Sequence, residues 1–213
     1  MYPFLNSSKT SKITFISFIF VLKTFKKMRN FLFLILLLVQ NSFSQSTYDN
    51  GKCIRTKNIS EKERLLRFPF SESQQIKILS FKGKPDEYPG QSLIKHINSI
   101  VLGKDVFRSE LYNETAVLSA EQINKLSDII FNFTYTRLPH EDAEVMCYMP
   151  RNAIMFLDSN NRIVAYLEIC FGCNNYKSSD KRFSIGEYCN EKYDMLKSIF
   201  ADSNIKYGIS IVE

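Results

Sequence analysis

One stretch, residues 153–173, constrains the fold more than any other part of the chain, because it reads as two apolar strands joined by a polar turn. Residues 153–157 and 163–171 are rich in branched and aromatic side chains, which favour β-strands. Residues 158–161 between them are Asp-Ser-Asn-Asn, and Asx side chains bond their own backbone and tolerate positive φ. Alternate residues of the second strand are all apolar, so one face is predicted to be core and the other mixed.

The cysteines gather around this hairpin. Antiparallel register puts position 147 opposite 172 or 173, which brings Cys147 near Cys173, although a proline interrupts the ladder between them. Cys170 is then left to pair with Cys189, and Cys53 is the odd thiol. We therefore predict one or two structural disulfides among Cys147, Cys170, Cys173 and Cys189.

Capping boxes mark three predicted helices, because a Ser followed three residues later by Glu or Gln satisfies two backbone N–H groups at a helix start. The three boxes are Ser60 with Glu63, Ser119 with Gln122, and Ser184 with Glu187. The last helix, with Cys189 on its inner face, is expected to end at residues 202–204.

Further elements follow from apolar patterning. Residues 75–81 and 205–211 are predicted as strands, and residues 106–117 look strand-like. Apolar residues from Leu93 to Val101 have helical spacing, and Gly103 is a suitable stop. Together these elements predict a two-layer α+β domain: a mainly antiparallel sheet with a central hairpin, covered by two or three helices.

The chain begins with an addressing segment. A short basic run at residues 28–30, an apolar run at 31–39 and small residues at 42–44 have the order of a signal peptide, and we expect cleavage after Ser44. Residues 1–27 are either an extended basic leader or sequence upstream of the true start at Met28, and we favour the second interpretation. The apolar run is too short for a permanent membrane span, which needs about 20 residues.

Removing the leader changes the charge of the protein. Residues 1–44 hold six of the 28 basic residues and none of the 22 acidic ones, so the rest of the chain carries 22 of each. A neutral domain gives no general reason to bind nucleic acid or an anionic membrane. We expect residues 45–74 to be loosely ordered and residues 75–213 to form a single α+β domain.

The cysteines also allow two kinds of active site. Cys170-Phe171-Gly172-Cys173 has the spacing of a redox motif, but a polar loop follows it where a helix N-terminus would lower the pKa of the first cysteine. Alternatively, Cys147, Cys170, Cys173 and Cys189 have the ligand number of a zinc site, although only one pair is closely spaced.

A polar cluster that includes His140 precedes Cys147, and Arg151 follows it. These residues could line a polar site, but a run of charged residues after a proline is more typical of a solvated loop. The chain has no phosphate-binding loop, no dinucleotide-binding glycine pattern and no Gly-x-Ser-x-Gly motif.

Three short motifs carry a resemblance. They are Cys147-Tyr148-x-Pro150-Arg151-x-Ala153-Ile154, Glu168-Ile169-Cys170-Phe171-x-Cys173 and Tyr188-Cys189-x-x-Lys192-Tyr193. This pattern resembles a group of small, uncharacterised exported bacterial proteins, over about the C-terminal third of the chain and more loosely over the helix after Ser119. The resemblance implies a periplasmic or secreted setting and transfers no functional residue.

The sequence favours an exported, disulfide-stabilised module that binds an unknown protein or small molecule and is not an enzyme. We expect no cofactor, no nucleic-acid partner and no membrane span after signal cleavage. The alternative is a cysteine-dependent redox or zinc-binding protein that uses Cys170 and Cys173.

Overall fold

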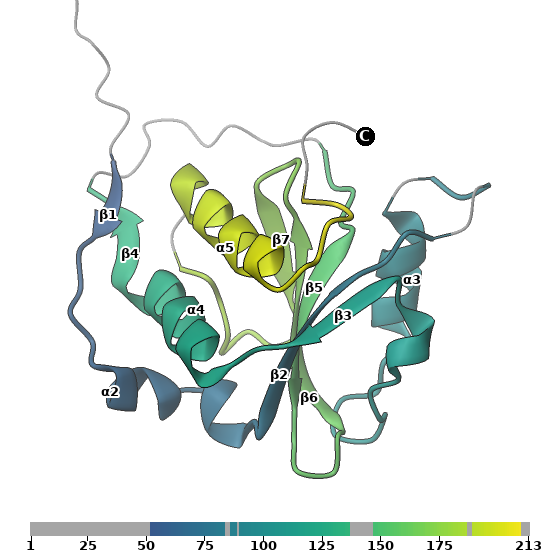
Figure 1. The fold of residues 1–213 in the computed structure, drawn as a ribbon, viewed down its shortest axis with the longest axis horizontal. Helices are drawn as coiled ribbons and strands as arrows, with labels where there is room; N and C mark the ends of the chain where they lie inside the picture. The colour runs from purple at the N-terminus through teal and green to yellow at the C-terminus, as the bar shows by residue number, and fades with distance from the viewer. Residues whose placement is uncertain (1–51, 84–85, 89, 137–146, 187–188, 210–213) are drawn as a thin grey trace, which may run out of the picture. The chain divides into compact units, whose positions relative to one another are not determined.

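A computed structural model describes residues 52–83, 86–88, 90–136, 147–186 and 189–209, and five of its strands form one antiparallel sheet (Figure 1). The strand order is β3-β2-β5-β6-β7, so the predicted hairpin lies at the centre of the sheet. The predicted leader, residues 1–44, lies outside the described residues. The strands are β2 (Gln75–Ser80), β3 (Glu114–Val117), β5 (Asn152–Leu157), β6 (Ile163–Cys170) and β7 (Asn175–Ser178).

The turn between β5 and β6 is built by its Asx side chains, as the sequence predicts. The Asp158 carboxylate accepts hydrogen bonds from the backbone N–H groups of Asn160 and Arg162, both at 2.8 Å. Asn161 adopts a positive φ of 60°, which asparagine tolerates. These contacts fix the register, in which Ala153 lies opposite Glu168.

Both faces of the sheet are covered, so the two-layer expectation is wrong. One face packs Ile78, Ile154 and Leu167 against α4 (Ala120–Asn132) and α5 (Asn190–Asp202). The other face packs Leu79 and Met155 against α3 (Gln91–Asn98). Figure 1 shows α4 and α5 on one side of the sheet and α3 on the other. The apolar run of β5, from Ala153 to Leu157, is buried on both faces and already indicates cover on both sides, but the prediction rested on the mixed second face of residues 163–171.

Two of the three capping boxes are present. The Ser119 hydroxyl accepts from the N–H of Gln122, whose side chain accepts from the N–H of Ser119. The same exchange between Ser60 and Glu63 starts α2 (Glu61–Leu65). Ser184 does not start a helix: its hydroxyl accepts from the N–H of Gly186, and α5 begins later, at Asn190. Gly186 has a φ of 81°, which is incompatible with a helix running through it.

Three other predicted boundaries differ from the structure. Helix α3 ends at Asn98, so Gly103 is not its stop. Only β3 forms within residues 106–117, and a 3₁₀ turn, η2 (Ser109–Leu111), precedes it. Residues 205–209 form a turn instead of the predicted final strand.

The part of the N-terminal segment that the structure describes, residues 52–74, packs against the rest of the fold. Strand β1 (Cys53–Arg55) pairs with β4 (Phe133–Tyr135), and a 3₁₀ turn, η1 (Phe70–Glu72), leads into β2. Helix α2 lies against α4 through the buried side chain of Arg64. The Arg64 guanidinium donates to Ser127 Oγ at 3.0 Å, to the Ile59 carbonyl at 2.6 Å and to the Asn124 side chain, and it lies 3.3 Å from Asp128. This network holds a segment that the sequence suggests is loose.

Helices in the described parts of the chain are too short or too polar to cross a membrane.

Replacing Arg64 with Met should destabilise the protein by about 3 kcal/mol, because it removes the charged partner of several buried polar groups. Chemical denaturation of the disulfide-intact protein measures the loss. Lys62→Met, an exposed change on the same helix, is the control and should cost less than about 0.5 kcal/mol. Equal stability of the two variants would show that the Arg64 network does not hold α2 in place.

Candidate functional site

The end of β6 is covered by a short lead-in segment, residues 147–150, which precedes β5. Leu167 and Ile169 face the core beneath α4 and α5, so Glu168 and Cys170 belong to the opposite face of the strand. Both are only 2% exposed. The backbone N–H of Met149 donates to Cys170 Sγ at 3.4 Å, which places the lead-in segment over this end of the strand.

Gly90, just before α3, lets the lead-in segment approach closely. Gly90 has a φ of 81°, and a Cβ at this position would lie 2.6 Å from the carbonyl carbon of Met149. Any other residue would therefore push the lead-in segment away from its position.

Three cysteines meet at this covered end. Cys147 and Cys173 form a disulfide with their Cα atoms 5.9 Å apart, which is the pair that the hairpin register suggests. Cys170 remains a free, buried thiol. The three sulfur atoms all lie within 4.8 Å of one another. The site is thus a disulfide with a thiol beside it.

The environment keeps Cys170 protonated at neutral pH. Burial raises the pKa of the Cys170 thiol. Backbone N–H groups of Met149, Cys173 and Gly172, together with the charge of Arg151, oppose this effect because they favour the thiolate. Cys170 is therefore not a preformed reactive thiolate, but groups that stabilise the thiolate already surround it.

Glu168 of β6 and Tyr148 of the lead-in segment add two further polar groups to this end of β6. Among the described residues, neither Oε1 of Glu168 nor the hydroxyl of Tyr148 makes a hydrogen bond of good geometry, although the two groups lie close enough to interact with each other. Burial raises the pKa of the Glu168 carboxyl, and the nearby Tyr148 hydroxyl and Lys177 ammonium offset part of this shift. Burial, reinforced by Glu168, also raises the pKa of Tyr148 above its usual range. The Lys177 ammonium lies 4.3 Å from the centre of the Tyr148 ring.

Glu168 and Tyr148 both stand in the motifs of the resemblance, but the sequence prediction gave neither of them a place in a site. One signal was available: a charged residue stands between Leu167 and Ile169 in an otherwise apolar strand. Such a position shows which face a residue belongs to, but it does not show whether another segment covers that face.

Of the predicted polar site, only Arg151 is described, since His140 lies outside the described residues. Arg151 stacks on Tyr207, with its guanidinium carbon 5.6 Å from the ring centre. Its charge lowers the pKa of Cys170, so Arg151 acts on the cysteine cluster.

The second disulfide differs from the expectation. Cys189 bonds Cys53, with their Cα atoms 5.5 Å apart, and does not bond Cys170. Because α5 begins at Asn190, Cys189 stands at the N-cap position of the helix and not within it. Cys53 lies in β1, in a segment that the sequence suggests is loose. The prediction that Cys53 is the odd thiol is therefore wrong.

The four-cysteine zinc set is not brought together. Cys147, Cys170 and Cys173 form one group, whereas Cys189 lies with Cys53 and Glu191 in another. Zinc binds cysteine as the thiolate, and both groups contain sulfurs that are already bonded to each other.

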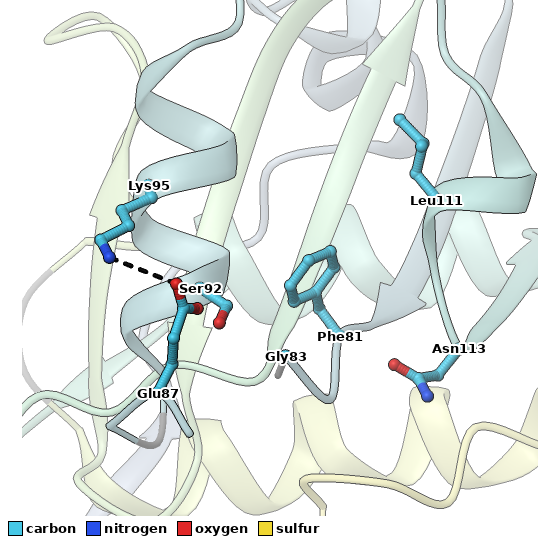
Figure 2. A pocket seen from close by; sticks show the side chains of 7 residues that line it. All are labelled: Phe81, Gly83, Glu87, Ser92, Lys95, Leu111 and Asn113. Carbon is cyan, nitrogen blue, oxygen red and sulfur yellow. Dashed lines mark hydrogen bonds and ion pairs between the residues drawn. The ribbon is translucent and has the colours of Figure 1, made fainter. Parts of the chain in front are cut away.

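A separate hollow of about 340 Å³ opens beside α3 (Figure 2). Figure 2 shows the Phe81 ring in its middle, the Lys95–Glu87 ion pair on one side, and Leu111 and Asn113 on the other. The ion pair spans 3.3 Å from Nζ to Oε1. The lining of the hollow comes from three separate segments, so no local sequence pattern predicts the hollow. The lining residues are Phe81, Gly83, Glu87, Ser92, Lys95, Leu111 and Asn113.

Phe81, which lines the hollow, belongs to a cluster of aromatic rings. Phe81 stacks on His96 with ring centres 5.6 Å apart, and His96 Nε2 lies 2.9 Å from the Tyr112 hydroxyl. Burial, together with the charge of Arg108, lowers the pKa of His96. Burial raises the pKa of Tyr112 to about 12, although Arg108 opposes this shift. Both shifts favour the uncharged forms of His96 and Tyr112 at neutral pH.

Comparison with known protein families, with characterised proteins and with solved structures finds no match to this chain. Function must therefore be argued from the arrangement of these residues.

Replacing Glu168 with Gln should stabilise the protein at neutral pH by on the order of 1 kcal/mol, because burial of the ionised carboxylate is costly and the amide carries no charge. Folding raises the pKa of Glu168, so the folded state binds this proton more tightly than the unfolded state. Relative to the variant, the wild type should lose stability as pH rises from the unfolded value of about 4.3. The loss should be complete once the pH exceeds the folded-state pKa.

Urea unfolding of wild type and Glu168→Gln, below and well above the unfolded carboxyl pKa, measures this difference. Val117→Thr, an exposed change on β3 that adds or removes no titratable group, should leave the stability difference independent of pH. The account of Glu168 is wrong if its variant differs from wild type by the same free energy at both pH values.

Proposed function

We propose that this protein is an exported module, braced by disulfides, that binds a ligand or partner without catalysing a reaction. The observation that carries the proposal is the pair of disulfides, Cys53–Cys189 and Cys147–Cys173, which join segments distant in sequence. Disulfides of this kind persist in oxidising compartments such as the periplasm or the extracellular space. The signal-peptide pattern of residues 28–44 supports the same location.

The burial of the polar groups at the cysteine end supports a non-catalytic role. Glu168 and Cys170 are 2% exposed and lie beneath the lead-in segment. A substrate could reach them only if that segment moved. The burial of these two residues therefore favours a structural role for this region and disfavours an acid–base or nucleophilic site.

The hollow beside α3 is the proposed binding site for the ligand. Its volume is at the lower end of the range for small-molecule sites. Phe81 and Leu111 offer apolar contact, while the Lys95–Glu87 ion pair and the Asn113 amide lie at opposite sides (Figure 2). This combination suits a small, flat molecule that is largely apolar and carries one polar group.

Secretion of the full chain from a bacterium by its own leader tests the location and the disulfide pattern. The exported protein should have the mass of a chain that begins at Gln45, with four cysteines bridged and no bound metal. At about pH 6, where few thiols are ionised, a maleimide should label one thiol, Cys170, and only after unfolding, because the native thiol is buried. A chain lacking residues 28–44 is the control and should stay in the cytoplasm with its cysteines reduced. Retention of the intact chain in the cytoplasm would contradict export.

Binding in the hollow can be tested with benzoate, which has a flat ring and one carboxylate. In NMR titrations, benzoate should shift the signals of residues that line the hollow. Leu111→Asp should abolish these shifts, because it adds a negative charge at an exposed position of the lining. Val117→Asp is the control, since Val117 is an exposed apolar residue outside the lining, and it should bind as wild type does. Shifts elsewhere on the protein, or unchanged binding in Leu111→Asp, would contradict this site.

A further inference from the structure

A free thiol held against a disulfide is chemically different from a free thiol alone. Sγ of Cys170 lies within 4.8 Å of both sulfurs of the Cys147–Cys173 bond. Thiol–disulfide exchange needs only a thiolate that can reach a disulfide sulfur. We propose that Cys170 is the internal nucleophile of an exchange site, at which it displaces Cys147 from Cys173.

The reaction is balanced within the protein. The Cys170 thiol loses its proton and its sulfur attacks Sγ of Cys173. The Cys170–Cys173 bond forms, the Cys147–Cys173 bond breaks, and Cys147 leaves as a thiolate that takes up a proton. One disulfide and one thiol are present before and after, so no oxidant or reductant is consumed.

The direction of attack follows from the local geometry. The N–H of Cys173 donates to the carbonyl of Cys170 at 3.2 Å, so a tight turn already holds these two residues together. Gly172 within this turn is exposed, and a Cβ there would meet nothing within 4 Å, so the turn has room to adjust. The new disulfide therefore closes a turn that exists before the reaction.

Exposure favours Cys147 as the leaving group. Cys170 is 2% exposed and Cys173 is 6% exposed, whereas Cys147 is half-buried. A leaving thiolate is better stabilised where water reaches it. The exchange keeps the two buried cysteines bonded and releases the cysteine with the most access to solvent.

The lead-in segment controls the reaction. Its Met149 N–H bonds Sγ of Cys170, and this contact, with the charge of Arg151, favours the thiolate that attacks. Burial of the thiol opposes ionisation, so exchange should be slow at neutral pH and faster as pH rises.

The product differs from the starting protein in what it can react with. A buried thiol is replaced by a thiol at Cys147 that solvent and other molecules can reach. The Cys147 thiol can then attack a disulfide of a partner, so that a mixed disulfide forms and one sulfur of the partner leaves as a thiol, which goes beyond the proposed binding role.

Peptide mapping of the exported, unreduced protein tests the exchange. Samples are held at about pH 6 or about pH 9, then unfolded and alkylated in acid before digestion with trypsin. Residues 138–151 carry Cys147, and residues 163–177 carry both Cys170 and Cys173. In the starting state these two peptides are linked and the alkyl label is on Cys170. After exchange, the label is on Cys147 and the second peptide contains an internal disulfide.

We expect the exchanged form to accumulate at the higher pH, at a rate that rises about tenfold per pH unit below the pKa of Cys170. The Cys53–Cys189 bond is the internal control and should not change. A label that stays on Cys170 at the higher pH overturns the proposal. A label on Cys173, with Cys147 bonded to Cys170, overturns the proposed direction of attack.

Two variants make the test independent of the rate. Cys147→Ser should contain two disulfides and no free thiol, because Cys170 and Cys173 then bond to each other. Two free thiols in this variant would overturn the proposal. Cys170→Ser should keep the Cys147–Cys173 bond unchanged at the higher pH, and loss of that bond there would show that Cys170 is not the nucleophile.

Discussion

The register of β5 against β6 is the constraint on which the candidate site depends, and it is constant from Asn152 to Phe156 before a bulge shifts it at Leu157. With Ala153 opposite Glu168 and Ile154 opposite Leu167, the apolar side chains of β6 enter the core beneath α4 and α5. A slip of one residue would reverse the two faces and place Glu168 in that core. The Asp158 turn prevents the slip, and so it also determines where Cys170 meets the disulfide.

Local signals explain what the sequence could predict. The period of two in β6, the Asx turn and the capping boxes at Ser60 and Ser119 each depend on residues close in the chain, and the structure contains all of them. The proximity of Cys147 and Cys173 follows from the same local register. The box at Ser184 fails because Gly186 adopts a left-handed conformation, which its spacing does not reveal.

Long-range packing explains what the sequence could not predict. The partner of Cys189 depends on the docking of β1 against β4, whose strands lie far apart in the chain. The burial of Glu168 depends on the lead-in segment, residues 147–150, which covers this end of β6. The hollow beside α3 forms only where three segments meet. It lies at the same end of the sheet as the cysteines, since the N–H of Phe81, in its lining, donates to the Arg151 carbonyl at 2.8 Å. Both features therefore rest on the placement of the chain that enters β5.

The Cys53–Cys189 bond spans 136 residues of sequence, and the Cys147–Cys173 bond lies entirely inside that span. Most of the described chain is thereby a covalent ring that contains a smaller ring. A protease that cuts one peptide bond anywhere between these two outer cysteines opens the ring without dividing the molecule. After a first cut of this kind, the protein therefore remains one molecule.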